Sequence, residues 1–206
     1  MKPRYFIDAH KLATPLVILL MIALYEQWNN YTAWAYLAMH GTYCLLWVLK
    51  SRLFPDSHWE RRLSLGRCLF IWLILSLYWI APWFITAGHV EAPPWLLALC
   101  ISLYILGIFL HYSSDMQKYT SLQLRPTELI TEGLWSKVRN PNYTGEFLIY
   151  LSFSIMPLHW LPPLLLAGVI IFVWLPQMVR KDRSLSRFSN FKEYKAHTKR
   201  MFPFLF

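Results

Sequence analysis

The positive charges of this chain are confined to four segments that alternate with long apolar runs. All 20 lysines and arginines fall in the N-terminal arm, in residues 50–67, in residues 118–139 and in the tail from Arg180. The connections between the other apolar runs, such as "EQWNNY" and "AGHVEAP", contain none. This alternation is typical of a polytopic membrane protein, because cytoplasmic loops collect lysine and arginine.

Six apolar runs approach the length of about 17–25 residues that crosses a bilayer as a helix. The predicted spans are about Leu12–Trp28, Thr32–Leu49, Ser64–Ala87, Pro94–His111, Tyr143–His159 and Leu161–Met178. Because the charged segments then lie on alternate sides, both termini are predicted to be cytoplasmic. The sequence therefore predicts an all-α membrane helical bundle, either in a bacterial inner membrane or in the endoplasmic reticulum.

Composition supports lipid as the solvent. Hydrophobic residues make up 56% of the chain and charged residues only 15%, whereas about a quarter of a soluble domain is charged. The net charge of +9 is explained by topology, so no nucleic-acid partner is expected. Residues 1–206 are predicted to form one integral membrane domain. The three cysteines are far apart and show no ligand spacing, so no metal site is expected.

The segment "GLWSKVRNPNYTGEF", residues 133–147, carries polar side chains into the fifth apolar run. Arg139, Asn142 and Glu146 are spaced by three and four residues, which predicts a shared helical face with Tyr143 beside it. Ionisable residues are costly in lipid and usually face a protein interior or a wet cavity. The alternative interpretation is structural, with Glu146 forming an ion pair with Arg139 or Lys137. No glycine pattern typical of a Rossmann dinucleotide site occurs.

This segment resembles the signature "GLW…RHPNYxGE" of the membrane steroid 5α-reductase and sterol reductase superfamily. Isoprenylcysteine carboxyl methyltransferases and phospholipid methyltransferases share a looser form of it. The stretch "SDMQKY", residues 114–119, and the ending "PFLF", residues 203–206, also resemble the reductases. The resemblance covers about residues 110–206. Asn140 departs from the usual histidine, and "VRKDRSL" lacks the glutamate pair of the methyltransferases.

The resemblance implies an NADPH-dependent oxidoreductase that reduces an activated C=C bond in a lipid or steroid-like substrate, within the membrane lipids. Residues 1–110 would form a four-span substrate-side half. Residues 111–206 would form a cofactor-binding half, with a two-span hairpin and an interfacial C-terminal helix. An S-adenosylmethionine-dependent lipid or isoprenylcysteine-type methyltransferase is the first alternative, and a non-catalytic membrane scaffold is the second.

Two sets of candidate residues follow. A hydrogen-bond donor to the substrate carbonyl would stabilise an enolate, and a tyrosine is the usual type. The catalytic candidates are Tyr36, His40 and Tyr43. The predicted cofactor-binding residues are Asp115, Lys118, Arg125, Arg139, Asn142, Tyr143, Glu146, Asp182, Arg183 and Tyr194. The lysine and arginine side chains in this set, together with Lys195, are suited to bind the phosphate groups of the cofactor.

Overall fold

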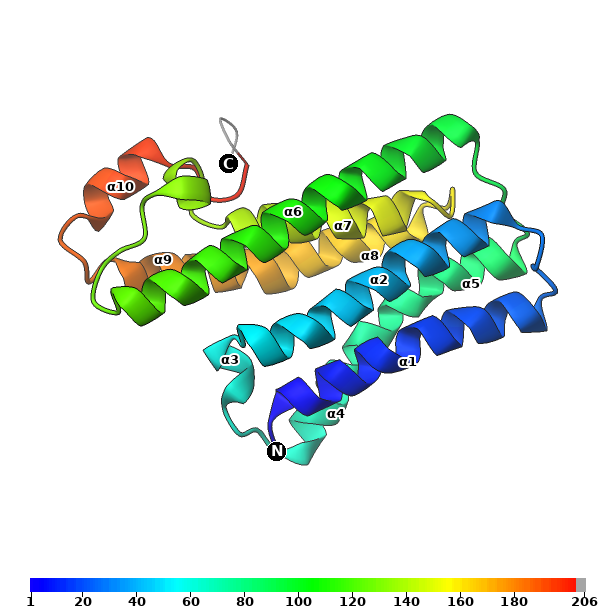
Figure 1. Ribbon diagram of the computed structural model, residues 1–206, viewed down its shortest axis with the longest axis horizontal. Coiled ribbons are helices and arrows are strands. Elements are labelled where there is room, and N and C mark those ends of the chain that lie inside the picture. Colours follow the sequence, from blue (N-terminus) through cyan, green and yellow to red (C-terminus); the bar gives the residue numbers. More distant parts are fainter. Residues whose placement is uncertain (203–206) are drawn as a thin grey trace. The chain divides into compact units, whose positions relative to one another are not determined.

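The computed structural model describes residues 1–202, and the regular elements of this range are helices apart from one isolated parallel bridge between Val138 and Lys199 (Figure 1). The "PFLF" ending, residues 203–206, lies outside the described residues. The longer elements are α1 Pro3–Leu24, α2 Tyr31–Leu53, α4 Leu65–Ser76, α5 Ile80–Ala87, α6 Pro94–Leu124, α7 Pro141–Ile155, α8 Leu161–Val169 and α9 Leu175–Leu185. The shorter elements are α3 Ser57–Glu60, η1 Leu77–Trp79, η2 Gly133–Ser136, η3 Ile170–Trp174 and α10 Phe191–His197.

Among residues 1–202, four helical stretches are long and apolar enough to cross a membrane, which supports an integral membrane protein. These stretches are Pro3–Leu24, Leu65–Ala87, Pro94–Leu124 and Leu161–Leu185. The all-helical class is thus confirmed for residues 1–202.

Helix boundaries differ from the predicted spans where polar residues continue a helix. Helix α1 begins at Pro3, whose fixed φ suits the first helical position. Part of the basic N-terminal arm is therefore helical. Helix α6 continues beyond the predicted end at His111 as far as Leu124. Asp115 and Lys118 therefore lie inside this helix rather than beyond its end. Nothing in "YSSDMQKYTSLQ" breaks a helix, whereas Pro126 disfavours helical geometry in the residue before it.

Two of the predicted spans are irregular, and a proline accompanies each irregularity. In the predicted span from Ser64 to Ala87, a 3₁₀ turn at Leu77–Trp79 separates α4 from α5, which contains Pro82. In the last span, the π-helix η3 lies just before Pro176. Proline removes a backbone donor and crowds the preceding turn, so such distortions are expected nearby.

The chain separates into two compact units. Unit 1 comprises residues 1–104 and 151–165, and unit 2 comprises residues 105–150 and 166–206. In unit 1, α1 packs against α2, α4 and α5. The centre of this unit contains polar and aromatic side chains of α2, including Tyr36, His40 and Tyr43, each at most 1% exposed.

In unit 2, α6 and α7 approach each other through two glycines. A Cβ atom placed on Gly145 would lie 2.4 Å from the backbone nitrogen of His111, and one on Gly107 would lie 2.8 Å from the carbonyl oxygen of Gly145. Only glycine permits such close contact between helix backbones. This crossing fixes the first turns of α7 against the middle of α6.

Candidate functional site

The residues just before α7 pair with the C-terminal tail instead of continuing the helix. The Arg139 amide donates to the Lys199 carbonyl at 2.8 Å, and the Lys199 amide donates to the Lys137 carbonyl at 3.2 Å. Helix α7 then begins at Pro141. The prediction that Arg139 shares a helical face with Asn142 and Glu146 is therefore wrong, because Arg139 precedes the helix.

Arg139 is buried in a network of acceptors. Its Nε and Nη2 atoms donate to the two carboxylate oxygens of Asp182 at 3.1 and 3.3 Å. Its Nη1 atom donates to the Thr198 carbonyl at 2.5 Å. The exposed fractions of the Arg139 and Asp182 side chains are only 6% and 9%. These two predicted cofactor residues thus bind each other and the tail.

Asn140 is completely buried and takes part in the same connection to the tail. Its Nδ2 atom donates to the Arg200 carbonyl at 2.9 Å, and its Oδ1 atom accepts from Lys181 Nζ at 2.9 Å. An amide provides both a donor and an acceptor, which suits these two partners. The asparagine that departs from the family signature therefore has a structural explanation. We call Arg139, Asn140, Lys181, Asp182 and Thr198 the tail clamp.

Tyr194, on α10, is also engaged with the protein. Its hydroxyl donates to the Trp135 carbonyl at 2.7 Å, and burial raises the pKa of the Tyr194 phenol. The sequence predicted one interfacial C-terminal helix in this part of the chain. In the structure, a turn separates α9 from α10, and Phe191 and Tyr194 are buried in unit 2.

The first turns of α7 and the facing part of α6 carry the remaining predicted polar residues. The Tyr143 hydroxyl donates to Gln177 Oε1 at 2.7 Å, and Glu146 is half-buried. His111 Nδ1 lies 3.3 Å from the Asn142 carbonyl oxygen, and His111 Nε2 lies 3.8 Å from Asp115 Oδ2. We call His111, Asp115, Asn142, Tyr143 and Glu146 the mouth cluster.

The Asn142 side chain contributes a buried amide oxygen to the mouth cluster. Its Oδ1 atom is buried and has no hydrogen-bond partner among residues 1–202. Leaving a buried polar atom unpaired costs about 1–3 kcal/mol, so such atoms need an explanation. A ligand that donates a hydrogen bond would provide one.

The predicted cations occupy different environments at the polar end of unit 2. Lys118 is half-buried on α6, and Arg183 is exposed on α9. Arg125 is exposed and forms ion pairs with Glu128 and Glu132. The hydrogen bond from Arg125 lowers the pKa of Glu132, and the same bond raises the pKa of Arg125.

The catalytic candidates gather in unit 1. His40 Nδ1 lies 3.1 Å from the Tyr36 hydroxyl, and the His40 ring stacks on Phe153 with centroids 4.5 Å apart. The sequence did not point to Lys11, which is 2% exposed and has its ammonium 4.4 Å from the centroid of the Tyr43 ring. Lys11 directly precedes the first apolar run, and this position was the sequence signal that could have identified it. The predicted span began one residue later, at Leu12, and so left Lys11 outside.

The fold and the site together define the class of this protein. It is a helical chain with several potential membrane spans and a group of polar side chains, the mouth cluster. A protein-family model described as "Protein of unknown function (DUF1295)" matches residues 55–200. The match covers more than two thirds of the chain, and the chain belongs to this family. A search of curated proteins finds no match.

Proposed function

We propose that this protein is a membrane-embedded NADPH-dependent reductase that acts on an activated C=C bond of a lipid or steroid-like substrate. The family to which it belongs is in the steroid 5α-reductase-like group, in agreement with the resemblance of residues 133–147. The observation that carries the proposal is the buried, unpaired Oδ1 atom of Asn142. It lies at the polar entrance of a membrane helix, where a cofactor can arrive from water.

The chemistry of this atom fits the proposed cofactor. An amide oxygen accepts hydrogen bonds, and the nicotinamide carboxamide offers N–H donors. The Glu146 carboxylate, one turn further along α7, is suited to accept from ribose hydroxyls. The exposed cations Arg183 and Lys195 suit phosphate groups. Arg139 and Asp182 are already paired with each other. The tail clamp, to which both belong, would therefore support the geometry of the mouth cluster.

Bound NADPH would supply the hydride for the reduction, while the protein positions the substrate and excludes water. Tyr36 is a candidate for donating a hydrogen bond to the substrate carbonyl oxygen as enolate charge develops there. His40 contacts this hydroxyl at 3.1 Å and would hold it in a fixed orientation. The buried Lys11 ammonium near Tyr43 would add positive potential in this unit.

The proposed topology has six crossings, with both termini cytoplasmic. Helix α2 has 23 residues and is long enough to cross the bilayer. Helix α7 has 15 residues, or about 22 Å of helix, so local thinning of the bilayer would accompany its crossing. The confinement of lysine and arginine to alternate connections supports this arrangement.

Three cysteine variants at exposed acidic positions test the topology. We expect a membrane-impermeant maleimide to label Glu91→Cys in intact cells, and to label Glu128→Cys and Glu193→Cys only after permeabilisation. The native cysteines are buried and provide a low background. If only the four most apolar stretches cross, Glu128→Cys would be labelled while the other two are protected, which would contradict six crossings.

The cofactor is tested by thermal stabilisation of the protein purified in detergent. A ligand that binds only the folded state raises the melting temperature with concentration. We expect NADPH to do so, and Glu146→Gln to weaken its apparent affinity by roughly tenfold through loss of a charge-assisted hydrogen bond. The matched control is Glu193→Gln, which replaces an exposed glutamate of the same unit and should leave the response unchanged.

The outcomes separate the candidate functions. Stabilisation by S-adenosylmethionine alone would replace the reductase proposal with the methyltransferase alternative. No response to either compound would favour a non-catalytic scaffold. An unchanged NADPH affinity in Glu146→Gln would show that Glu146 has a structural role.

A further inference from the structure

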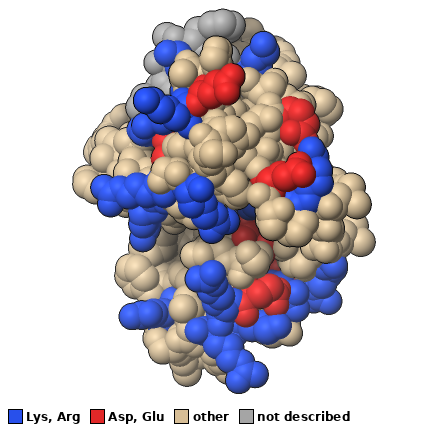
Figure 2. All heavy atoms as spheres, turned by 90° about the vertical axis from the view of Figure 1, so that its left-hand side faces the viewer, with Lys and Arg blue, Asp and Glu red and all other residues tan. Residues whose placement is uncertain are grey.

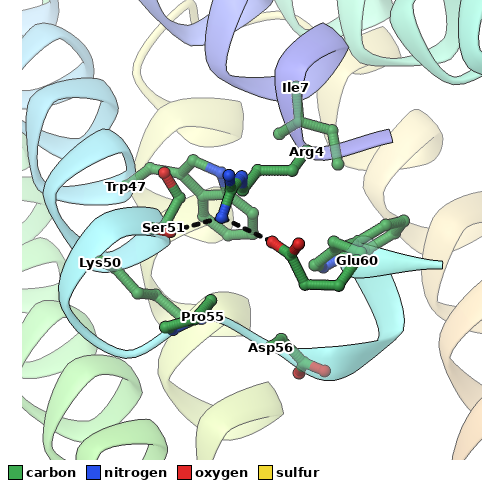
Figure 3. Close-up of a pocket in the computed structure, with 9 residues that line it drawn as sticks. Arg4, Ile7, Trp47, Lys50, Ser51, Pro55, Asp56 and Glu60 are labelled. Atoms are coloured by element: carbon green, nitrogen blue, oxygen red, sulfur yellow. Dashed lines mark hydrogen bonds and ion pairs between the residues drawn. The ribbon is translucent and has the colours of Figure 1, made fainter. Parts of the chain in front are cut away.

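Unit 1 contains a pocket at the end where α1 begins and α2 ends, beside the short helix α3 (Figure 3). It encloses about 310 Å³ of empty space, part of which is open to solvent. Only about 20 Å³ of it is accessible to the centre of a water-sized sphere, slightly more than one water molecule needs. The size suits a small polar group and excludes a whole lipid or cofactor.

The pocket combines an apolar wall with charged side chains. Trp47, Trp59, Ile7 and Pro55 supply the apolar part. Tryptophan is enriched where membrane proteins meet the water interface, because its ring is apolar and its N–H is polar. The pocket lies next to the N-terminus of α1, which is one of the four potential membrane spans. In the proposed topology, this is the level at which lipid headgroups meet a membrane protein.

The two acidic residues of the lining are already engaged. Glu60 accepts a hydrogen bond from Lys2 at 2.7 Å and lies 2.6 Å from Arg4 Nη1. The hydrogen bond from Lys2 is the main reason that the pKa of Glu60 is lowered. Asp56 accepts from the His58 amide at 3.0 Å and caps α3. These contacts offset the repulsion that the carboxylates would exert on an anion.

Two basic side chains line the pocket, and Arg4 has a donor that could bind an anion. Arg4 lies between Ser51 and Glu60 in Figure 3, yet its Nε atom is buried without a hydrogen-bond partner among the described residues. Lys50 is 7% exposed, and its ammonium lies 4.9 Å from the centroid of the Trp47 ring. A guanidinium with an unused donor and a nearby ammonium are typical partners of phosphate oxygens.

The wider surroundings of the pocket are positive. Residues 1–10 and 50–67 contain seven lysines and arginines against three carboxylates. Lysine and arginine side chains are prominent on the face of the molecule shown in Figure 2. Basic pockets between membrane helices on the cytoplasmic side commonly bind anionic headgroups.

We propose that the pocket lined by Arg4, Trp47, Lys50 and Trp59 binds the phosphate group of an anionic phospholipid. The phosphate oxygens would accept from Arg4 Nε and Lys50 Nζ, while the tryptophans contact the glycerol region and the acyl chains remain in the bilayer. This site is independent of the proposed reductase activity. It would anchor the N-terminus of α1 and the end of α2 to the lipid surface.

The test uses the delipidated full chain in detergent and measures thermal stabilisation by added lipid. We expect dioleoyl phosphatidylglycerol to raise the melting temperature in a saturable manner. Dioleoyl phosphatidylcholine has the same acyl chains without net charge, and it should have a much smaller effect. Competition by millimolar inorganic phosphate would identify free phosphate as an alternative source of the same anion. Equal stabilisation by the two lipids would overturn the proposal.

Variants identify the binding residues. Arg4→Gln and Lys50→Gln should each weaken the apparent affinity for phosphatidylglycerol by roughly tenfold, since each removes a charge-assisted hydrogen bond. Arg62→Gln is the matched control, because Arg62 is exposed and does not line the pocket. Unchanged affinity in both pocket variants would contradict the site.

The variant Glu60→Gln distinguishes phosphate binding by Arg4 from a purely structural role of the Arg4–Glu60 ion pair. If Arg4 serves only to pair with Glu60, this change should lower stability without improving lipid binding. If Arg4 binds phosphate, removal of the competing carboxylate should tighten phosphatidylglycerol binding, by about threefold or more. Weaker binding in Glu60→Gln would count against the phosphate site even if Arg4→Gln does not fold.

Discussion

Asp182→Asn is expected to lower the free energy of unfolding by about 3–5 kcal/mol, because it leaves a buried guanidinium without its counter-ion. Arg139 and Asp182 are joined by two hydrogen bonds, and both side chains are less than a tenth exposed. Asp182 also accepts from Arg200 Nε at 3.4 Å. Urea unfolding of the detergent-solubilised protein without cofactor measures the loss.

The neighbouring Arg183 provides the matched control. It lies on the same helix but is exposed, so Arg183→Gln should change the free energy of unfolding by less than about 0.5 kcal/mol. The double variant Arg139→Met with Asp182→Asn should be less destabilised than the sum of the two single variants, because each single change leaves one buried partner. Unchanged stability in Asp182→Asn, combined with a lost cofactor response, would instead assign Asp182 to the cofactor.

The fold class could be predicted from the sequence because lipid requires long apolar helices, and these are visible as runs of hydrophobic residues. The helix ends were harder to predict. Polarity suggested that the fourth span stops at His111, but a helix that leaves the apolar region continues until a residue breaks it. Here it continues to Leu124, just before the Arg125–Pro126 step.

The candidate site was only partly visible in the sequence. Asn142 and Glu146 stood out because polar side chains entering an apolar run are costly. The partners of Arg139 and Asn140 did not stand out, because Asp182 and Arg200 lie more than 40 residues away along the chain. Local periodicity describes one helix at a time and carries no information about how the C-terminal tail returns to residues 137–144.

Gly145→Ala is expected to destabilise the protein by about 3 kcal/mol, near the upper end of typical costs of overpacking. The new methyl group would lie 2.4 Å from the His111 nitrogen and 2.7 Å from the Gly107 carbonyl oxygen. Both are backbone atoms of α6, so no side-chain rotation relieves the overlap. The helices must separate, and this would displace Asn142 from His111. The same urea unfolding measurement gives the loss.

Gly168→Ala is the matched control, because among the described residues no atom other than those of its chain neighbours and its own helix backbone lies within 4 Å of the Cβ position at this glycine of α8. This change should be neutral or stabilise by up to about 1 kcal/mol, since alanine favours helix more than glycine does. Because the α6–α7 crossing sets the geometry of the mouth cluster, any folded Gly145→Ala protein should also lose the NADPH response that Gly168→Ala retains. Equal stability of the two variants would show that α6 and α7 are not in close contact in the membrane protein.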